Sequence, residues 1–130
     1  RPEVLALGAA ARQRVVEQLG RVLRSNTRAM DASGRLTGER FAILLSGVGL
    51  ATAHTRMEGL RRQCATHIVA HEGNDLGFSV SMGVASFPHT ASTVDEVTKA
   101  SEAALQQAQA RGGNQVVLAS IKFDDTARAT

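Results

Sequence analysis

The amino-acid sequence predicts an α+β fold, and three observations lead to this prediction. Apolar residues recur at helical spacing in three segments that end at glycine or polar residues. Short apolar or alternating runs typical of strands lie before, between and after these segments. The resulting order is β-α-β-β-α-β-α-β. Its β-α-β-β-α-β core is the ferredoxin-like arrangement, in which helices cover one face of one antiparallel sheet.

The first half of the chain is expected to form a strand, a helix and a β-hairpin. A short apolar run predicts the strand at residues 3–8. Helical spacing of valines and leucines predicts the helix at residues 10–24, with arginines and glutamines on its other face. Residues 31–36 and 40–46 are typical of two strands, because the Thr-Gly pair between them favours a tight turn.

The middle of the chain is expected to form a second helix and a long strand. The helix begins at Leu50, and Gly73 ends it. Cys64, the only cysteine, falls on the apolar stripe of this helix, so we expect a core residue and neither a disulfide nor a cysteine-based zinc site. Residues 76–87 alternate strictly, which predicts one continuous strand.

The last part of the chain is expected to form a helix, a strand and a tail. Thr93 and Glu96 form a capping box that begins the helix, and a Gly-Gly pair ends it. Residues 115–121 predict the last strand. Because the sequence shows no linker, repeat or low-complexity segment, we expect one domain at residues 1–121, followed by a polar tail at residues 122–130.

The composition excludes several classes of function. The formal charge of +3 is too small to argue for DNA binding, and the absence of Trp and Tyr leaves little for stacking on single-stranded nucleic acid. No apolar run approaches the length that inserts into a membrane.

His67 and His71 lie four residues apart on the predicted helix and could share a metal ion, but no third ligand is near. We therefore expect solvated side chains rather than a metal site.

Three motifs resemble one family. Arg28 and Asp31 form an Arg-x-x-Asp motif, and a Thr-Gly-Glu-Arg-Phe hairpin follows five residues later. Further along lie FSVSMGVASFP at residues 78–88 and SEAALQQAQARGGNQV at residues 101–116. The order and spacing of these motifs resemble the diguanylate cyclase family that is known by its Gly-Gly-Asp-Glu-Phe (GGDEF) hairpin. The resemblance covers roughly residues 10–121.

The resemblance implies both a fold and a chemistry. Members of this family have a nucleotide-cyclase-like fold and join two GTP molecules into cyclic di-GMP with two metal ions. Many also carry an inhibitory site that binds the product at an Arg-x-x-Asp motif. Compared with the family, this chain is shortened at the N-terminus, because the segment with a guanine-reading Asn and Asp is absent.

The catalytic half of the family pattern is degenerate in this chain. Where the family has two glycines and two carboxylates, the hairpin has Thr37, Gly38, Glu39 and Arg40. A guanidinium in place of the second carboxylate repels a divalent metal, and phosphoryl transfer without metal loses its main charge stabilisation. Residues 3–8 contain none of the metal-binding Asp residues that the family places at the end of its first strand.

Further replacements agree with this interpretation. Arg12 and Gln13 stand roughly where the family has a Gly-Asp pair. In the last helix Gln109 replaces a phosphate-binding Lys and Gly113 replaces an Arg, for which Arg111 could substitute only in part. Together the replacements predict a domain that is not an enzyme and has no catalytic residue, no metal site and no cofactor.

The inhibitory half of the pattern is retained. Arg28 and Asp31 have the spacing from the hairpin that the resemblance requires. Because the preceding helix is expected to end near residues 25–26, a turn at residues 28–31 would put both side chains on one side. Arg28 could then donate two hydrogen bonds to guanine O6 and N7, and Asp31 could accept from the N1 and N2 hydrogens. Both residues are expected at the surface.

The phosphates of the ligand need further cations. The family often adds an Arg on the second helix, where this chain has Gly59. Arg56 and Arg62 lie one turn to either side, so they complete the predicted cyclic di-GMP site.

The resemblance therefore predicts a cyclic di-GMP receptor module of a larger, cytoplasmic bacterial protein, for example a regulator of exopolysaccharide export. The ligand could bind as an intercalated dimer that a second subunit or a neighbouring domain closes. Two alternatives stay open. Arg28 and Asp31 could form only a surface ion pair in a ligand-free scaffold or dimerisation module, which Gly59 supports. Glu39 supports the other alternative, a GTP-binding domain with residual cyclase function.

Overall fold

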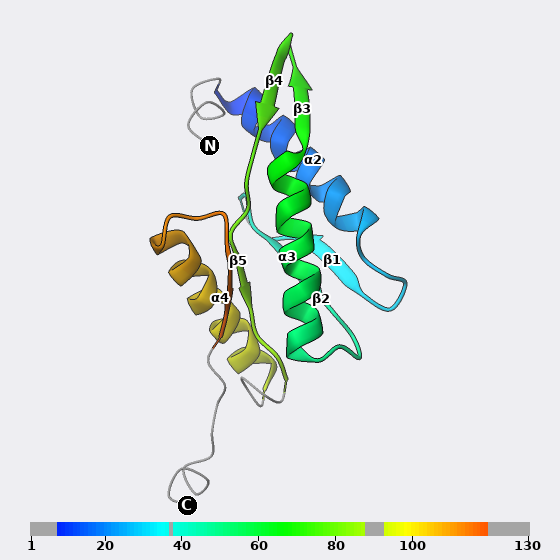
Figure 1. Ribbon diagram of the computed structural model, residues 1–130, viewed down its shortest axis with the longest axis vertical. Coiled ribbons are helices and arrows are strands. Elements are labelled where there is room, and N and C mark those ends of the chain that lie inside the picture. Colours follow the sequence, from blue (N-terminus) through cyan, green and yellow to red (C-terminus); the bar gives the residue numbers. More distant parts are fainter. Residues whose placement is uncertain (1–7, 37, 88–92, 120–130) are drawn as a thin grey trace, which may run out of the picture. The chain divides into compact units, whose positions relative to one another are not determined.

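The computed structural model describes residues 8–36, 38–87 and 93–119 of the chain (Figure 1). Three helices and three small sheets make up this described part, which confirms the α+β prediction. The strand expected at residues 3–8 and the tail expected at residues 122–130 lie outside the described residues.

The chain divides into two compact units, and each is described here by itself. The first unit comprises residues 1–48 and 59–80. The second comprises residues 49–58 and 81–130.

Helix α2 (Ala9–Ser25) forms where valines and leucines recur at helical spacing. Its buried residues are Ala11, Val16, Gly20, Val22 and Leu23. The Asn26 side chain donates a hydrogen bond of 2.7 Å to the Val22 carbonyl oxygen, which satisfies one of the carbonyls that a helix end leaves without a partner. The helix therefore ends at the position that the sequence predicts.

Strands β1 (Ala32–Arg35) and β2 (Phe41–Leu44) form the predicted antiparallel hairpin in the first unit. Both strands are shorter than expected. The Leu36 amide donates to the Arg40 carbonyl oxygen at 2.8 Å and so closes the hairpin turn. Helix α2 packs against β1, which places the hairpin beside the helix.

Helix α3 (Leu50–Thr66) ends seven residues before the glycine that was expected to end it. After the helix, β3 (Ile68–His71) and β4 (Asn74–Gly77) form an antiparallel hairpin in the first unit. Glu72 and Gly73 have positive φ angles of 49° and 79°, which a tight hairpin turn requires. The helical prediction for residues 67–72 is therefore wrong, since cross-strand pairing overrides the apolar spacing.

This hairpin also corrects the interpretation of the two histidines. His67 follows the end of α3 and His71 lies in β3, so they are not one turn apart on a helix. The His67 ring packs edge to face against Phe78 with centroids 6.0 Å apart, and Phe78 is only 3% exposed. His67 thus contributes to the packing of the first unit and is not a fully solvated side chain.

The single strand expected at residues 76–87 is two strands. Residues 74–77 pair with β3 as β4, whereas β5 (Met82–Val84) lies in the second unit and pairs with β6 (Val116–Leu118). The first part of residues 76–87 pairs with β3 and the later part pairs with β6. Alternation of apolar residues predicts a strand but does not indicate which strand it pairs with.

The second unit contains the last helix, α4 (Val94–Ala110), between β5 and β6. Its capping box is confirmed, because the Glu96 amide donates to Thr93 Oγ1 at 3.1 Å. Strands β5 and β6 are parallel, as expected for strands joined through a helix. A Cβ at Gly83 would overlap the Ser101 carbonyl oxygen, so glycine lets β5 lie directly against α4.

The expectation of one antiparallel sheet is wrong for the described residues. They form three two-stranded sheets, two antiparallel and one parallel. One small buried cluster of the second unit consists of Ala104, Ala108 and Val117. Within residues 8–36, 38–87 and 93–119, none of the helices has both the length and the apolar character that a membrane span needs.

Candidate functional site

The chain makes a tight turn at residues 28–31, between α2 and β1, as the sequence predicts. The Asp31 amide donates to the Arg28 carbonyl oxygen at 2.9 Å. In the other direction the Arg28 amide donates to Asp31 Oδ2 at 3.0 Å. The two ends of the Arg-x-x-Asp motif are therefore bonded to each other through both backbone and side chain.

The Asp31 carboxylate is buried, with a side-chain exposure of 0%. Its Oδ2 also accepts from Arg28 Nε at 3.4 Å, and its Oδ1 accepts from the Ser46 amide at 3.3 Å. The carboxylate thus joins the turn to the segment that follows β2. The expectation that Asp31 lies at the surface is wrong, because two backbone amides hold its side chain inside the turn.

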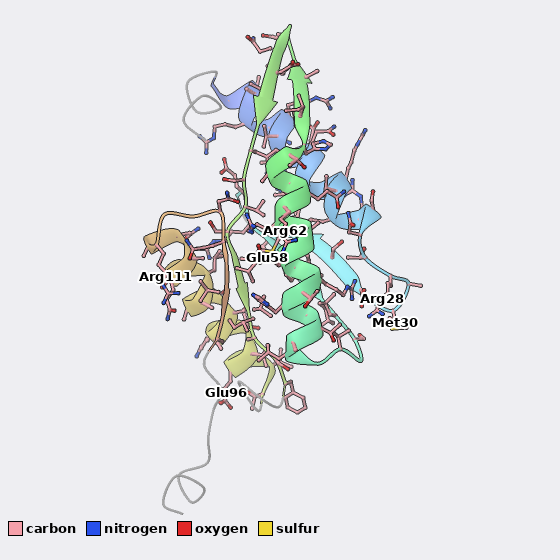
Figure 2. The ribbon with its side chains drawn as sticks, in the orientation of Figure 1. Arg28, Met30, Glu58, Arg62, Glu96 and Arg111 are labelled. Carbon is pink, nitrogen blue, oxygen red and sulfur yellow. The ribbon has the colours of Figure 1, made fainter. Side chains whose placement is uncertain are left out.

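The Arg28 side chain is 51% exposed, which agrees with the expected surface position. Its Nε donates to Asp31, and its two Nη atoms have no hydrogen-bond partner among the described residues. Figure 2 shows Arg28 beside Met30 at the outer end of the loop between α2 and β1, and Met30 is 62% exposed. The turn therefore presents one guanidinium and one apolar side chain to solvent.

The two arginines expected to support this turn lie on α3. Arg62 belongs to the first unit, and Figure 2 shows it on the helix, set apart from Arg28. Arg56 belongs to the second unit, which is described separately. Gly59 is exposed, and a Cβ placed on it would meet nothing within 4 Å. Within the first unit, the structure therefore brings Arg28 and Asp31 together and places Arg62 apart from them.

The tip of the β1–β2 hairpin carries the remnant of the family's catalytic motif. Glu39 Oε1 accepts from Arg12 Nε at 2.9 Å and from Arg12 Nη2 at 2.6 Å. Both side chains are about half exposed, at 47% for Arg12 and 54% for Glu39. The one carboxylate of the tip is therefore paired with a guanidinium from the first turns of α2.

Two more arginines flank this carboxylate along the hairpin. Arg35 Nε donates to the Gly38 carbonyl oxygen at 3.0 Å, and Arg40 follows Glu39 directly. The tip thus combines three guanidinium groups with one carboxylate, which is an electrostatic environment that repels cations. The pairing of Arg12 with Glu39 was missed from the sequence, since nothing local links residues 27 positions apart.

The remaining candidate groups do not form a site. Within the described ranges, no three His, Cys, Asp or Glu side chains lie close enough to hold a metal ion. Cys64 is fully buried in α3, as expected, and burial raises the pKa of its thiol to about 11. A thiol in this state is protonated near neutral pH and is a poor nucleophile or metal ligand.

Comparisons with known proteins agree with this fold. The profile of the family described as "Diguanylate cyclase, GGDEF domain" matches residues 6–115. The chain is 25% identical over 111 residues to diguanylate cyclase A of Treponema denticola, which covers 85% of this chain and 30% of that protein. It is 30% identical over 105 residues to the response regulator PleD of Caulobacter vibrioides, covering 79% of this chain and 23% of that protein. The chain thus spans less than a third of either relative.

Solved structures show the same fold. The GGDEF domain of PA1120 (YfiN or TpbB) from Pseudomonas aeruginosa has a TM-score of 0.84 at 24% identity, over 90% of this chain and 73% of that one. The GGDEF domain of DgcB from Caulobacter crescentus, crystallised with c-di-GMP, has a TM-score of 0.75 at 21% identity, over 84% and 64%. Because the family profile covers most of the sequence and the fold agrees, this chain belongs to the diguanylate cyclase GGDEF-domain family.

Proposed function

We propose that this chain is a catalytically inactive GGDEF domain that binds cyclic di-GMP through Arg28. The observation that carries the proposal is the contrast within the hairpin region. The Arg28–Asp31 turn is ordered by four hydrogen bonds and presents a half-exposed guanidinium. The tip at residues 38–40 instead has one carboxylate, and that carboxylate is bound by an arginine.

The residues at the hairpin tip support the proposal that this domain is catalytically inactive. Two-metal phosphoryl transfer needs several carboxylates whose charge outweighs that of nearby cations. Here a metal ion would have to displace Arg12 from Glu39. It would then be bound next to Arg40, the residue that directly follows Glu39. Both changes weaken metal binding through electrostatic repulsion, so the geometry favours an inactive tip.

Arg28 is suited to a guanine base. A bidentate contact from arginine to guanine O6 and N7 is the commonest specific base contact of any side chain. The Nη atoms of Arg28 have no hydrogen-bond partner among the described residues and are the donors for such a contact. The related domain of DgcB was crystallised with c-di-GMP, which supports the choice of ligand.

Asp31 has a different role in this proposal from the one that the motif suggests. The Asp31 side chain is 0% exposed, so its carboxylate could accept from guanine N1 and N2 only after a rearrangement that disturbs its bonds to the Arg28 and Ser46 amides. Breaking charge-assisted hydrogen bonds in a buried position is costly. We therefore assign Arg28 as the contact residue and Asp31 as the positioning residue that fixes the turn and the Arg28 Nε atom.

Further cations and a partner would complete the site. We propose that an intercalated ligand dimer, whose phosphates need these cations, draws in a second subunit or a neighbouring domain of a larger bacterial protein. Light scattering with and without ligand tests this part. An unchanged mass and shape at saturation would argue against it.

A ligand-free scaffold is the second candidate function, and two observations favour it. The buried Asp31 side chain is bonded to the Arg28 and Ser46 amides, and Gly59 leaves α3 without the expected arginine. A fold that needs Asp31 for its own turn would keep the Arg-x-x-Asp spacing without any ligand. The GTP-binding alternative has less support, since Glu39 is engaged by Arg12.

Calorimetric titration of the purified domain separates the candidates. Saturable heat with cyclic di-GMP, and none with GTP and magnesium, is the result expected of the receptor. Silence with both ligands would favour the scaffold. Heat with GTP and magnesium alone would contradict the proposed function and favour the GTP-binding alternative.

A further inference from the structure

A cleft of about 360 Å³ lies between α2 and the β1–β2 hairpin, within the first unit. Its volume falls in the range of small-molecule sites. The cleft is lined by the second half of α2 on one side and by residues 33–35 and Phe41 on the other. The residues of the Arg28–Asp31 turn and those of the hairpin tip at residues 38–40 are not part of its lining.

The charge of this cleft is strongly positive. Arg21 and Arg24 lie one turn apart on α2, and Arg35 of β1 is also part of the lining. Glu17 is the only acidic residue among the described residues of the lining. Among the residues that the structure describes, neither Arg21 nor Arg24 has an ion-pair partner, and Arg35 uses its Nε for the Gly38 carbonyl oxygen. Unneutralised guanidiniums gathered in a concave site favour an anion, and their planar donor geometry matches phosphate.

The shape of the cleft depends on a glycine in the middle of α2. A Cβ on Gly20 would lie 3.5 Å from Phe41 Cε2 and 3.3 Å from Arg24 Nη1. Gly20 therefore lets the Phe41 ring and the Arg24 guanidinium approach the helix backbone closely. Any longer side chain at this position would project into the space between the helix and the ring. The half-buried Phe41 ring supplies a flat apolar wall beside the cations.

We infer that this cleft binds a phosphate monoester that carries a planar ring, such as a nucleoside monophosphate. Arg21 and Arg24 bind the phosphate, the Ser33 hydroxyl adds a hydrogen bond, and the ring of the ligand lies against Phe41. This site is separate from the proposed cyclic di-GMP site, since the two share no residue.

Calorimetry of the whole chain with adenosine 5′-monophosphate at low salt tests the inference, with adenosine and inorganic phosphate as fragments. The monophosphate is expected to bind saturably and more tightly than either fragment. Arg24→Ala should weaken binding about 10- to 100-fold, the usual effect of losing a hydrogen bond to a charged group. Gly20→Leu should abolish binding by filling the cleft.

Arg14→Ala is the matched control, because it removes the same charge from the same helix two turns away from Arg21, outside the cleft. It is expected to bind the monophosphate like the parent. Equal losses in Arg14→Ala and Arg24→Ala would show binding to general positive charge and overturn the inference. Absence of saturable binding, or adenosine binding as tightly as the monophosphate, would overturn it as well. If Gly20→Leu does not fold, the Arg24→Ala variant still tests the inference, because Arg24 is exposed and its replacement should leave the fold intact.

Discussion

The two ends of β1 hold their carboxylates in different ways. Just before the strand, the Asp31 side chain is buried and is bonded by the amides of Arg28 and Ser46. At the hairpin tip, Glu39 is half exposed, and among the described residues only the side chain of Arg12 is bonded to it. The backbone itself depends on Asp31, whereas Glu39 could be replaced without leaving an amide unsatisfied. A retained motif residue can thus stabilise the backbone of a turn, and its presence alone does not show that it binds a ligand.

The largest expected effect concerns catalysis. The purified domain should make no detectable cyclic di-GMP from GTP and magnesium, because a metal at the tip would have to displace Arg12 from the one carboxylate and would be repelled by Arg40, the next residue in the chain. Chromatography of the reaction mixture over time checks this, with an active GGDEF protein as the positive control. If product accumulates in proportion to the amount of this domain, the hairpin tip is catalytically active. The contrast between an inactive tip and a ligand-binding turn at the other end of β1 would then be wrong.

Asp31→Ala should strongly destabilise the fold. The change leaves the Arg28 and Ser46 amides without their acceptor and removes the partner of Arg28 Nε. We expect a loss of about 2–3 kcal/mol in the free energy of unfolding, measured by urea denaturation. Asp75→Ala is the control, since Asp75 is an exposed carboxylate on β4 and should change stability little. If both variants unfold at the same urea concentration, the structural role of Asp31 is refuted.

Gly59→Arg should strengthen cyclic di-GMP binding. The position is open on the surface of α3, so an arginine fits without a clash and supplies the cation that the family pattern places there. A gain of about 3- to 10-fold in affinity is expected from one added charge-assisted contact. Gly59→Ala raises helix propensity equally well and adds no charge, so its affinity should stay at the parent value. A gain that Gly59→Ala reproduces would assign the effect to the helix instead of the ligand.

Arg12→Ala should have the smallest effect. The Arg12–Glu39 pair is half exposed, so solvent screens it, and its loss should lower stability by less than about 1 kcal/mol. Cyclic di-GMP affinity should not change, because the pair lies at the other end of β1. A marked loss of affinity in this variant would mean that the two ends of the strand are coupled.

Local signals in the sequence predicted the elements that depend on neighbouring residues. The β1–β2 hairpin, the end of α2 near Asn26 and the capping box of Thr93 and Glu96 are all confirmed. Each depends on contacts within a few residues, which the pattern of side chains encodes directly.

The errors concern features that distant residues decide. The β3–β4 hairpin and the division of residues 76–87 depend on which strand pairs with which, and alternation is the same for any partner. The burial of Asp31 depends on the Ser46 amide, 15 residues away. The cleft beside Gly20 required the hairpin to be packed on α2, so no sequence motif indicated it.

The central claim is that Arg28 is the residue through which this domain binds cyclic di-GMP. Titration of the parent and of Arg28→Ala with cyclic di-GMP tests it most directly. Loss of a bidentate contact to guanine, worth roughly 1–3 kcal/mol, should lower the affinity about 5- to 150-fold. The thermal midpoint without ligand should scarcely move, since the Arg28 side chain is half exposed and its amide still bonds Asp31. Equal affinity of Arg28→Ala and the parent would contradict the account.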